Sequence, residues 1–135
     1  MDAGSEFRAA LDRALAEADA DERIGPAICA TKLRLRLEFT DIGMTLNVAV
    51  AETGQRLEWS FGRVEWEPKL TLSMTSEVGN SYLLGRESLA IAIARGRVKV
   101  SGESRVALLY LPATRLISEP YRRVVQNTYP ELATA

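Results

Sequence analysis

Apolar residues near the start of the chain recur with the spacing of one helix face. They follow the i, i+3, i+4, i+7 pattern that predicts an amphipathic helix, and they are Phe7, Ala10, Leu11, Ala14, Leu15 and Ala18. Ser5 stands where an N-cap would lie. In the stretch DADERIGPAICAT that follows, Gly25-Pro26 predicts that the helix stops and that a second short helix begins.

Between residues 33 and 61 the period of the apolar positions changes to two. One face of each predicted strand is then apolar and the other is charged or polar. The apolar rows are Leu33, Leu35, Leu37 and Phe39, then Met44, Leu46, Val48 and Val50, then Leu57, Trp59 and Phe61. The loop Asp41-Ile42-Gly43 and the pair Thr53-Gly54 separate these rows. The pattern predicts three antiparallel strands joined as a meander.

Residues 70–95 contain apolar positions with the strand period of two and with the helix period of about 3.6. A fourth strand is predicted from the alternating residues Leu70, Leu72 and Met74. Residues 76–84 predict a helix that ends at Gly85. Residues 87–95 alternate like a strand, but their alanine content and Gly96 at a C-cap position favour a helix.

The last third of the chain predicts one more strand and two helices. A fifth strand is predicted, with Val98 and Val100 on its inner face. Gly102 ends this strand, a helix over residues 104–110 follows, and Pro112 interrupts it. A last helix is expected to start at Ser118-Glu119-Pro120.

The order of these elements is typical of the α+β class. We expect a five-stranded, mainly antiparallel sheet with helices packed on one face, in a single domain that spans residues 1–135. A domain of this length buries roughly two-thirds of the surface of its unfolded chain, so it can form a real core. Residues 1–6 could be the remnant of a tag, because the string GSEF resembles a cloning scar, and they carry no weight in the functional argument.

Composition narrows the classes of function. Seventeen basic and eighteen acidic residues give a formal charge of −1, so we expect no nucleic-acid partner. The chain has no histidine, which removes serine and cysteine triads and most zinc sites. Its single cysteine, Cys29, excludes an internal disulfide and is interpreted as a small buried residue. Without a membrane-spanning run or a signal peptide, the chain is expected in the cytoplasm.

Three groups of residues are candidates for phosphate binding or for catalysis by carboxylates. The string from Gly79 to Gly85 has the wrong spacing for a phosphate loop and lacks its lysine. Asp41 is interpreted as the hydrogen-bonding residue of its own turn. Glu65 and Glu67 flank Trp66 in a loop that we expect to be solvated.

Charged residues indicate two further possible binding surfaces, one on the outer sheet face and one near the C-terminus. A basic face is predicted from Arg34, Arg36, Arg97 and Lys99. It lacks the aromatic side chains that nucleic-acid readers use for stacking, so we interpret it as a solvated surface. The terminal segment is amphipathic, with Tyr121 and Val124 against Arg122 and Arg123, and either docks on the domain, covers a pocket mouth or touches a membrane.

Several motifs in order resemble the sterol carrier protein 2 family and the related C-terminal domains of bacterial alkyl sulfatases. The resemblance is strongest over residues 20–125 and is carried by Phe39-Thr-Asp-Ile-Gly43, Leu70-Thr-Leu-Ser-Met74, Leu83-Leu-Gly-Arg86, an alanine-rich segment and Ala94-Arg-Gly-Arg-Val-Lys-Val-Ser-Gly102. The resemblance implies that sheet and helices enclose an apolar tunnel that binds sterols, fatty acids or fatty acyl-CoA esters. It implies no catalytic residue, cofactor or metal. The terminal Ala133-Thr134-Ala135 does not resemble a peroxisomal signal, which favours a bacterial cytoplasm.

The resemblance also implies, element by element, which residues form the tunnel wall. Its expected residues are Leu72, Met74, Leu83, Leu89, Ile93, Val98, Val100 and Leu108. The first hypothesis is a non-enzymatic carrier of a hydrophobic ligand, with transient contact to a membrane or a partner enzyme. The second is an interaction or dimerisation module that presents an aliphatic substrate to a partner enzyme. An enzyme of the ketosteroid isomerase kind ranks last, because it needs a carboxylate inside an apolar cavity.

Overall fold

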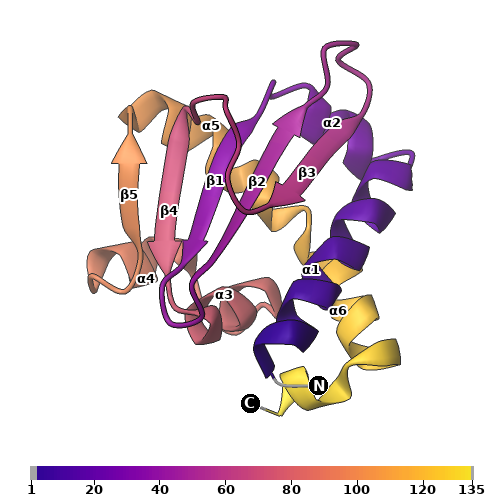
Figure 1. Cartoon of the computed structure of the whole chain (residues 1–135), viewed down its shortest axis with the longest axis vertical. Helices are drawn as coiled ribbons and strands as arrows, with labels where there is room; N and C mark the ends of the chain where they lie inside the picture. Colours follow the sequence, from indigo (N-terminus) through magenta and orange to yellow (C-terminus); the bar gives the residue numbers. More distant parts are fainter. Residues whose placement is uncertain (1–2, 135) are drawn as a thin grey trace.

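A computed structural model describes residues 3–134 of the chain (Figure 1). Six α-helices, five strands and one 3-10 helix follow one another along this part of the chain. In chain order they are α1 (Ala3–Ala20), α2 (Ile24–Cys29), β1 (Arg34–Phe39), β2 (Met44–Val50), β3 (Leu57–Phe61), β4 (Leu70–Met74), α3 (Ser76–Leu83), α4 (Leu89–Ala94), β5 (Lys99–Gly102), α5 (Ser104–Arg115), α6 (Ser118–Thr128) and η1 (Pro130–Ala133).

The strands form one sheet in the order β3-β2-β1-β4-β5. The predicted meander is confirmed, because β1 pairs antiparallel with β2 and β2 pairs antiparallel with β3. Strand β4 joins the other side of β1 and is parallel to it, whereas β5 is antiparallel to β4. The sheet is therefore mixed and mostly antiparallel.

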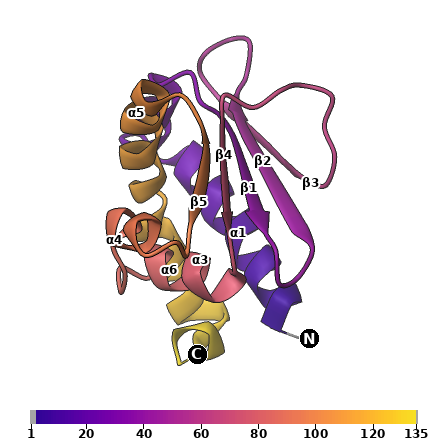
Figure 2. The ribbon, with the colours of Figure 1, turned by 90° about the vertical axis from the view of Figure 1, so that its left-hand side faces the viewer.

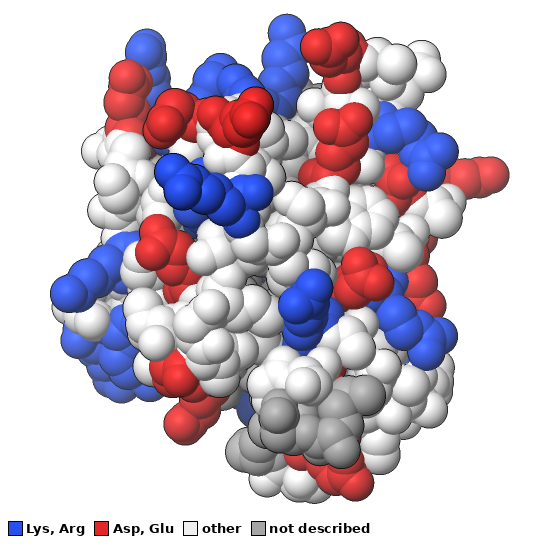
Figure 3. Space-filling view, viewed as in Figure 1, with Lys and Arg blue, Asp and Glu red and all other residues white. Residues whose placement is uncertain are grey.

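All helices lie on one face of this sheet, as the alternating apolar rows predict (Figure 2). The opposite face carries the loop between β3 and β4. In that loop the ring of Trp66 lies 5.2 Å from the guanidinium carbon of Arg34 on β1, so this outer face does have an aromatic residue, contrary to the expectation. Basic and acidic side chains are interspersed on the side seen in Figure 3, without a continuous basic area.

The first two helices confirm the expected break, but their ends differ from the prediction. Ser5 lies inside α1 and is not its N-cap. The break falls at residues 21–23, where the Asp21 carboxylate accepts hydrogen bonds from the backbone N–H groups of Arg23 and Ile24. Gly25 is in the first turn of α2, where a Cβ would lie 2.9 Å from the carbonyl oxygen of Asp19. The two helices approach closely at this glycine.

Helix α5 continues through Pro112, where the sequence predicted an interruption. A proline at this position removes the hydrogen bond to the carbonyl group of Leu108. Leu108 is exposed, so water can satisfy that carbonyl, and the helix runs on to Arg115. Ser118 is the first residue of α6 and does not cap it, because Ile117 occupies the N-cap position.

Asp41 connects the first hairpin to α3. Its carboxylate oxygens accept hydrogen bonds from the backbone N–H and the hydroxyl group of Ser76, both at 2.7 Å. Burial acts to raise the pKa of Asp41, but the hydrogen bonds from Ser76 and from the turn's own N–H groups outweigh it and lower the pKa. The residue therefore stabilises its turn, as predicted, and also holds the start of α3.

The C-terminal helices are tied to α3 by a buried polar chain. The hydroxyl group of Tyr121 donates to Oδ1 of Asn80 at 2.6 Å, and Nδ2 of Asn80 donates to the carbonyl oxygen of Leu132 at 2.8 Å. Tyr121 also packs edge-on against Phe7 of α1. The expectation that the terminal segment docks on the domain is confirmed.

A similar polar contact holds the end of α1 against the start of β3. The Asp19 carboxylate, whose side chain is 4% exposed, accepts hydrogen bonds from Nε of Arg56 and from the backbone N–H of Leu57, both at 2.8 Å. Burial acts to raise the pKa of Asp19, but these hydrogen bonds and the positive charge of Arg56 lower it below its usual 3.8.

We expect Asp19→Asn to lower the free energy of unfolding at pH 7 by about 1 to 2 kcal/mol. The stabilisation is fully present above the unfolded-state pKa and is lost as the pH falls through the lower folded-state pKa. Urea unfolding of wild type and variant from pH 7 to pH 2.5 measures this, and the two curves should converge at the acid end. Glu17→Gln, an exposed position on the same helix, is the matched control. A constant difference at all pH values would contradict the assignment.

Candidate functional site

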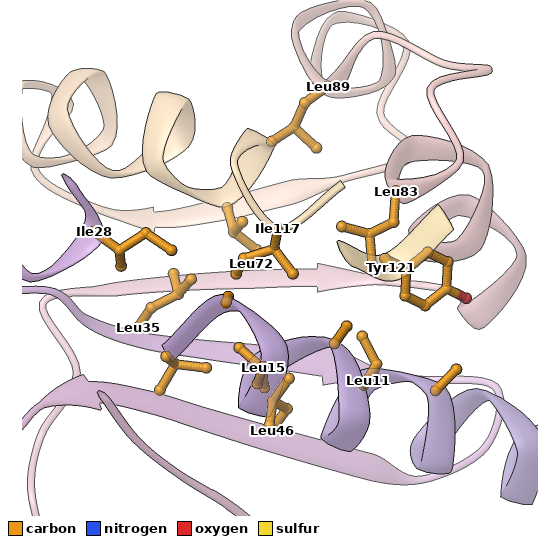
Figure 4. Close-up of a cluster of buried hydrophobic side chains, with 14 of the residues drawn as sticks. Leu11, Leu15, Ile28, Leu35, Leu46, Leu72, Leu83, Leu89, Ile117 and Tyr121 are labelled. Atoms are coloured by element: carbon orange, nitrogen blue, oxygen red, sulfur yellow. The ribbon is translucent and has the colours of Figure 1, made fainter. Parts of the chain in front are cut away.

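An apolar cavity lies between the sheet and the helices. Its volume is about 40 Å³, and only apolar atoms face it. Figure 4 shows the side chains of the two layers pointing toward one another around this space. The lining residues are Leu11, Leu15, Leu33, Leu35, Leu37, Phe39, Leu46, Val48, Leu72, Met74, Gly79, Tyr82, Leu83, Leu89, Thr114 and Ile117.

The floor of the cavity is formed by neighbouring residues of the three central strands. Leu37 on β1 lies opposite Leu46 on β2 and opposite Leu72 on β4. Residues that pair across strands point to the same face of a sheet, so these three side chains form a row. The period of two seen in the sequence is what places the row under the helices.

The roof comes from several helices and the loops between them. Helix α1 contributes Leu11 and Leu15, one turn apart, and Ile117 lies between α5 and α6. On α3, a Cβ at Gly79 would lie only 2.7 Å from Cε1 of Phe39. The glycine therefore lets α3 approach the sheet closely at one end of the cavity.

Half of the wall residues predicted from the sequence lie at this cavity. Leu72, Met74, Leu83 and Leu89 line it. Ile93 is half-buried and packs against the core outside the lining. Val98 is buried but precedes β5 instead of lying within it, and it does not line the cavity. The ligand contacts of these residues stay a prediction.

Val100 and Leu108 are exposed, so their predicted place on an interior wall is wrong. Val100 is opposite Leu72 and shares its sheet face, but β5 is an edge strand and leaves the side chain 36% exposed. Leu108 is 77% exposed because it is on the outer side of α5. The inner side of α5 carries Tyr110, Ala113 and Thr114, which recur at the spacing i, i+3, i+4.

Sequence reasoning missed other lining residues as possible ligand contacts. Leu11, Leu15 and the β1 row are predicted by the sequence only as apolar faces of a helix and a strand. Ile117 and Thr114 were missed because Pro112 was read as a helix end. If α5 is extended to residue 115, its apolar periodicity continues through Tyr110, Ala113 and Thr114 to Ile117, and this signal could have found them.

Tyr82 and Thr114 are the polar residues on the wall, and their hydroxyl groups satisfy each other. The Thr114 hydroxyl donates to the carbonyl oxygen of Leu111 at 2.7 Å, which leaves its oxygen to accept from the Tyr82 hydroxyl at 2.8 Å. Burial raises the pKa of Tyr82. Only their carbon atoms therefore face the cavity. The cavity lining also has no carboxylate, which is the group that an isomerase-like reaction needs.

The rest of residues 3–134 adds no metal site and no reactive thiol. Within that range no three His, Cys, Asp or Glu residues gather as metal ligands. Cys29 is buried, as predicted, and burial raises the pKa of its thiol, so the reactive thiolate is disfavoured. None of the helices in the described part is both long and apolar enough to cross a bilayer.

Comparison with known proteins identifies the fold. No protein-family model matches the chain, and no curated protein matches it by sequence. A crystal structure of sterol carrier protein 2 aligns over 84% of this chain and 94% of its own, with a TM-score of 0.62 and 14% identity. The ubiquinone synthesis protein UbiJ-SCP2 aligns over 76% and 88%, with a TM-score of 0.57 and 18% identity.

The sec-alkylsulfatase Pisa1 from a Pseudomonas species aligns over 64% of this chain, with a TM-score of 0.55 and 16% identity. The matched region is 13% of the sulfatase chain, so the chain spans a small part of that enzyme. At these identities the likeness is one of fold. The α+β fold class and the resemblance to sterol carrier protein 2 and to the sulfatase domain, both expected from the sequence, are confirmed, and an open tunnel is not shown.

Proposed function

We propose that this chain, which has the sterol carrier protein 2 fold, binds the aliphatic part of a lipid-like molecule between its sheet and its helices and carries it unchanged. The observation that carries the proposal is the cavity between the two layers, which only apolar atoms face. Ligand pockets of this kind are concave, mostly apolar and few per protein. The name of one structural neighbour, sterol carrier protein 2, supports the same class of ligand.

A bound chain needs more room than about 40 Å³, so binding requires the layers to separate locally. Burial of an alkyl chain contributes about 0.8 kcal/mol per methylene, or roughly 8 kcal/mol for ten carbons before ordering costs. Local openings of a folded domain cost less than global unfolding. Burial of a medium-length chain therefore offsets the cost of a local opening of this kind.

The opening is expected at α4. This six-residue helix buries only Leu89 and Ala92, and its Ile91 is 50% exposed. Leu89 also lines the cavity, so an outward movement of α4 removes part of the roof. Sterols, fatty acids and fatty acyl-CoA esters all present apolar groups that this route could admit.

The proposal is tested by finding and measuring the ligand. Protein purified without detergent should release a lipid when its bound molecules are analysed by native mass spectrometry. Delipidated protein should bind 11-(dansylamino)undecanoic acid saturably with micromolar affinity, and the probe should slow amide hydrogen exchange in α4 more than in β1. A well-folded monomer that neither retains lipid nor binds the probe would contradict the carrier.

A second candidate function is favoured by exposed apolar side chains on the side of the molecule where α4, β5 and α5 lie (Figure 1). Leu108 and Leu109 on α5 are 77% and 52% exposed, and the outer edge of β5 has no strand beside it among residues 3–134. Such a surface fits a module that dimerises or presents an aliphatic substrate to a partner enzyme. This candidate predicts a concentration-dependent mass and no saturable probe binding.

A further inference from the structure

A second, polar cleft adjoins the apolar cavity. It has a volume of about 490 Å³ and lies between the loop that joins α3 to α4 and the junction of α5 with α6. Its lining residues are Tyr82, Gly85, Arg86, Glu87, Ser88, Arg115, Leu116, Ser118, Glu119 and Arg122.

The cleft and the cavity share a wall. Tyr82 lines both spaces. At the junction of α5 and α6, Thr114 and Ile117 line the cavity while Arg115 and Ser118 line the cleft. Because sequence neighbours face opposite sides of the same wall, a molecule that passes Tyr82 would have one end in each space.

Arginines dominate the charge of the cleft. Arg86, Arg115 and Arg122 line it together with Glu87 and Glu119. Both acids are already paired with arginines that do not line the cleft. Glu87 pairs with Arg97, and Glu119 pairs with Arg123 at 3.1 Å and with Arg23 at 3.7 Å.

The cleft arginines point to a shared anion. Within residues 3–134, neither Arg115 nor Arg122 has a carboxylate at ion-pair distance, and Arg86 donates to the carbonyl oxygen of Ala133. Nη1 of Arg122 would lie 3.2 Å from a Cβ at Gly85, so the glycine leaves room for this guanidinium over the loop. Guanidinium groups bind the oxygens of carboxylates and phosphates in a forked geometry.

We propose that this cleft binds the anionic head group of an amphiphile whose alkyl chain occupies the apolar cavity. The inference rests on the proposed function, because the cavity must accept the chain. It adds that the head group is an oxyanion, a carboxylate or a phosphate, and that Arg115 and Arg122 are its main contacts. Uncharged aliphatic alcohols of equal length are bound more weakly.

The test compares ligands that share a dodecyl chain and differ in the head group. Displacement of the dansylated probe by dodecanoate, dodecyl phosphate, dodecanol and dodecylammonium is measured with wild type, Arg115→Ala and Arg122→Ala. The three ionic ligands are kept below their critical micelle concentrations, and dodecanol is kept below its solubility limit. We expect each variant to weaken the two anions about tenfold and to leave dodecanol within about twofold. Only the anions should weaken as salt is raised. The stronger anion identifies the head group.

The matched control is Arg105→Ala, which removes the same charge from α5, the helix that ends at Arg115. Arg105 pairs with Glu103 in an exposed contact and does not line the cleft, so this variant should bind all four ligands as wild type does. Equal affinity of wild type for dodecanoate and dodecanol, or equal losses for both in the variants, would overturn the head-group site while leaving the carrier intact. Binding of none of the four would instead contradict the proposed function itself.

Discussion

The variant Ile117→Trp is expected to weaken binding of the dansylated probe at least about 100-fold, because the larger side chain fills the space that the ligand chain needs. Ile117 faces the cavity from between α5 and α6 and is buried. An indole in a cavity of about 40 Å³ excludes several methylenes. Losing the burial of four methylenes costs about 3 kcal/mol, which is more than a 100-fold loss of affinity.

Overpacking also lowers stability, so folding must be measured with binding. We expect Ile117→Trp to lose about 1 to 3 kcal/mol of unfolding free energy and to keep a cooperative transition. Leu89→Trp, on α4, fills the same cavity from another element and should give the same loss of binding. Retained binding in two folded variants would place the ligand elsewhere.

The control for both variants is Leu108→Trp. The sequence put Leu108 on the tunnel wall, whereas the structure puts it on the outer side of α5. This variant should therefore bind the probe like wild type. A loss of binding in Leu108→Trp alone would restore the wall that the sequence predicted and would contradict the cavity described above.

Local patterns were sufficient for most of the fold. The rows of alternating residues predicted each strand, since one sheet face is buried and side chains alternate at a period of two. The hairpin at Gly43, whose φ is +59°, follows from the residue that such a turn requires. The helical assignment of α4 was correct although its residues alternate, because Gly96 ends it with a φ of +75°.

Helix ends were predicted less well, because they depend on surroundings that the sequence does not contain. Ser5 and Ser118 are good capping residues, but α1 extends past the first and Ile117 precedes the second. The sequence predicts an interruption at Pro112, but the exposure of Leu108 allows the helix to continue. This single error hid the inner face of α5 and two residues of the cavity wall.

The cavity and the cleft could not be predicted as shapes. Whether Leu72 meets a partner or faces an open space depends on how closely the helices approach the sheet, which no pattern along one strand records. The cleft brings together Arg86, Arg115 and Arg122 from a loop and two helices. The arginines dominate the charge of the cleft because Glu87 and Glu119 pair with arginines outside it. These pairs form only in the folded chain.

The second large effect is a loss of stability, which is expected when the two glycines of the stretch RGRVKVSG, Gly96 and Gly102, are replaced. Gly102→Ala is expected to lower the free energy of unfolding by about 3 kcal/mol, and Gly96→Ala by about 1 kcal/mol. Both glycines have a positive φ, +138° at Gly102 and +75° at Gly96. Only at Gly102 would a Cβ also collide with the backbone, at 2.6 Å from the carbonyl oxygen of Lys69. A Cβ at Gly96 would have no neighbour within 4 Å.

Urea unfolding of the two variants measures this difference directly, because each adds a single methyl group at a residue with a positive φ. Gly102 lies opposite Leu70 at the end of β5, so relief of the collision must move β5 away from β4. That movement uncovers Leu72, which is opposite Val100 and lines the cavity. We therefore expect faster hydrogen exchange in β5 and weaker probe binding in Gly102→Ala alone. Equal losses of stability in the two variants would mean that the close contact with Lys69 does not constrain this edge.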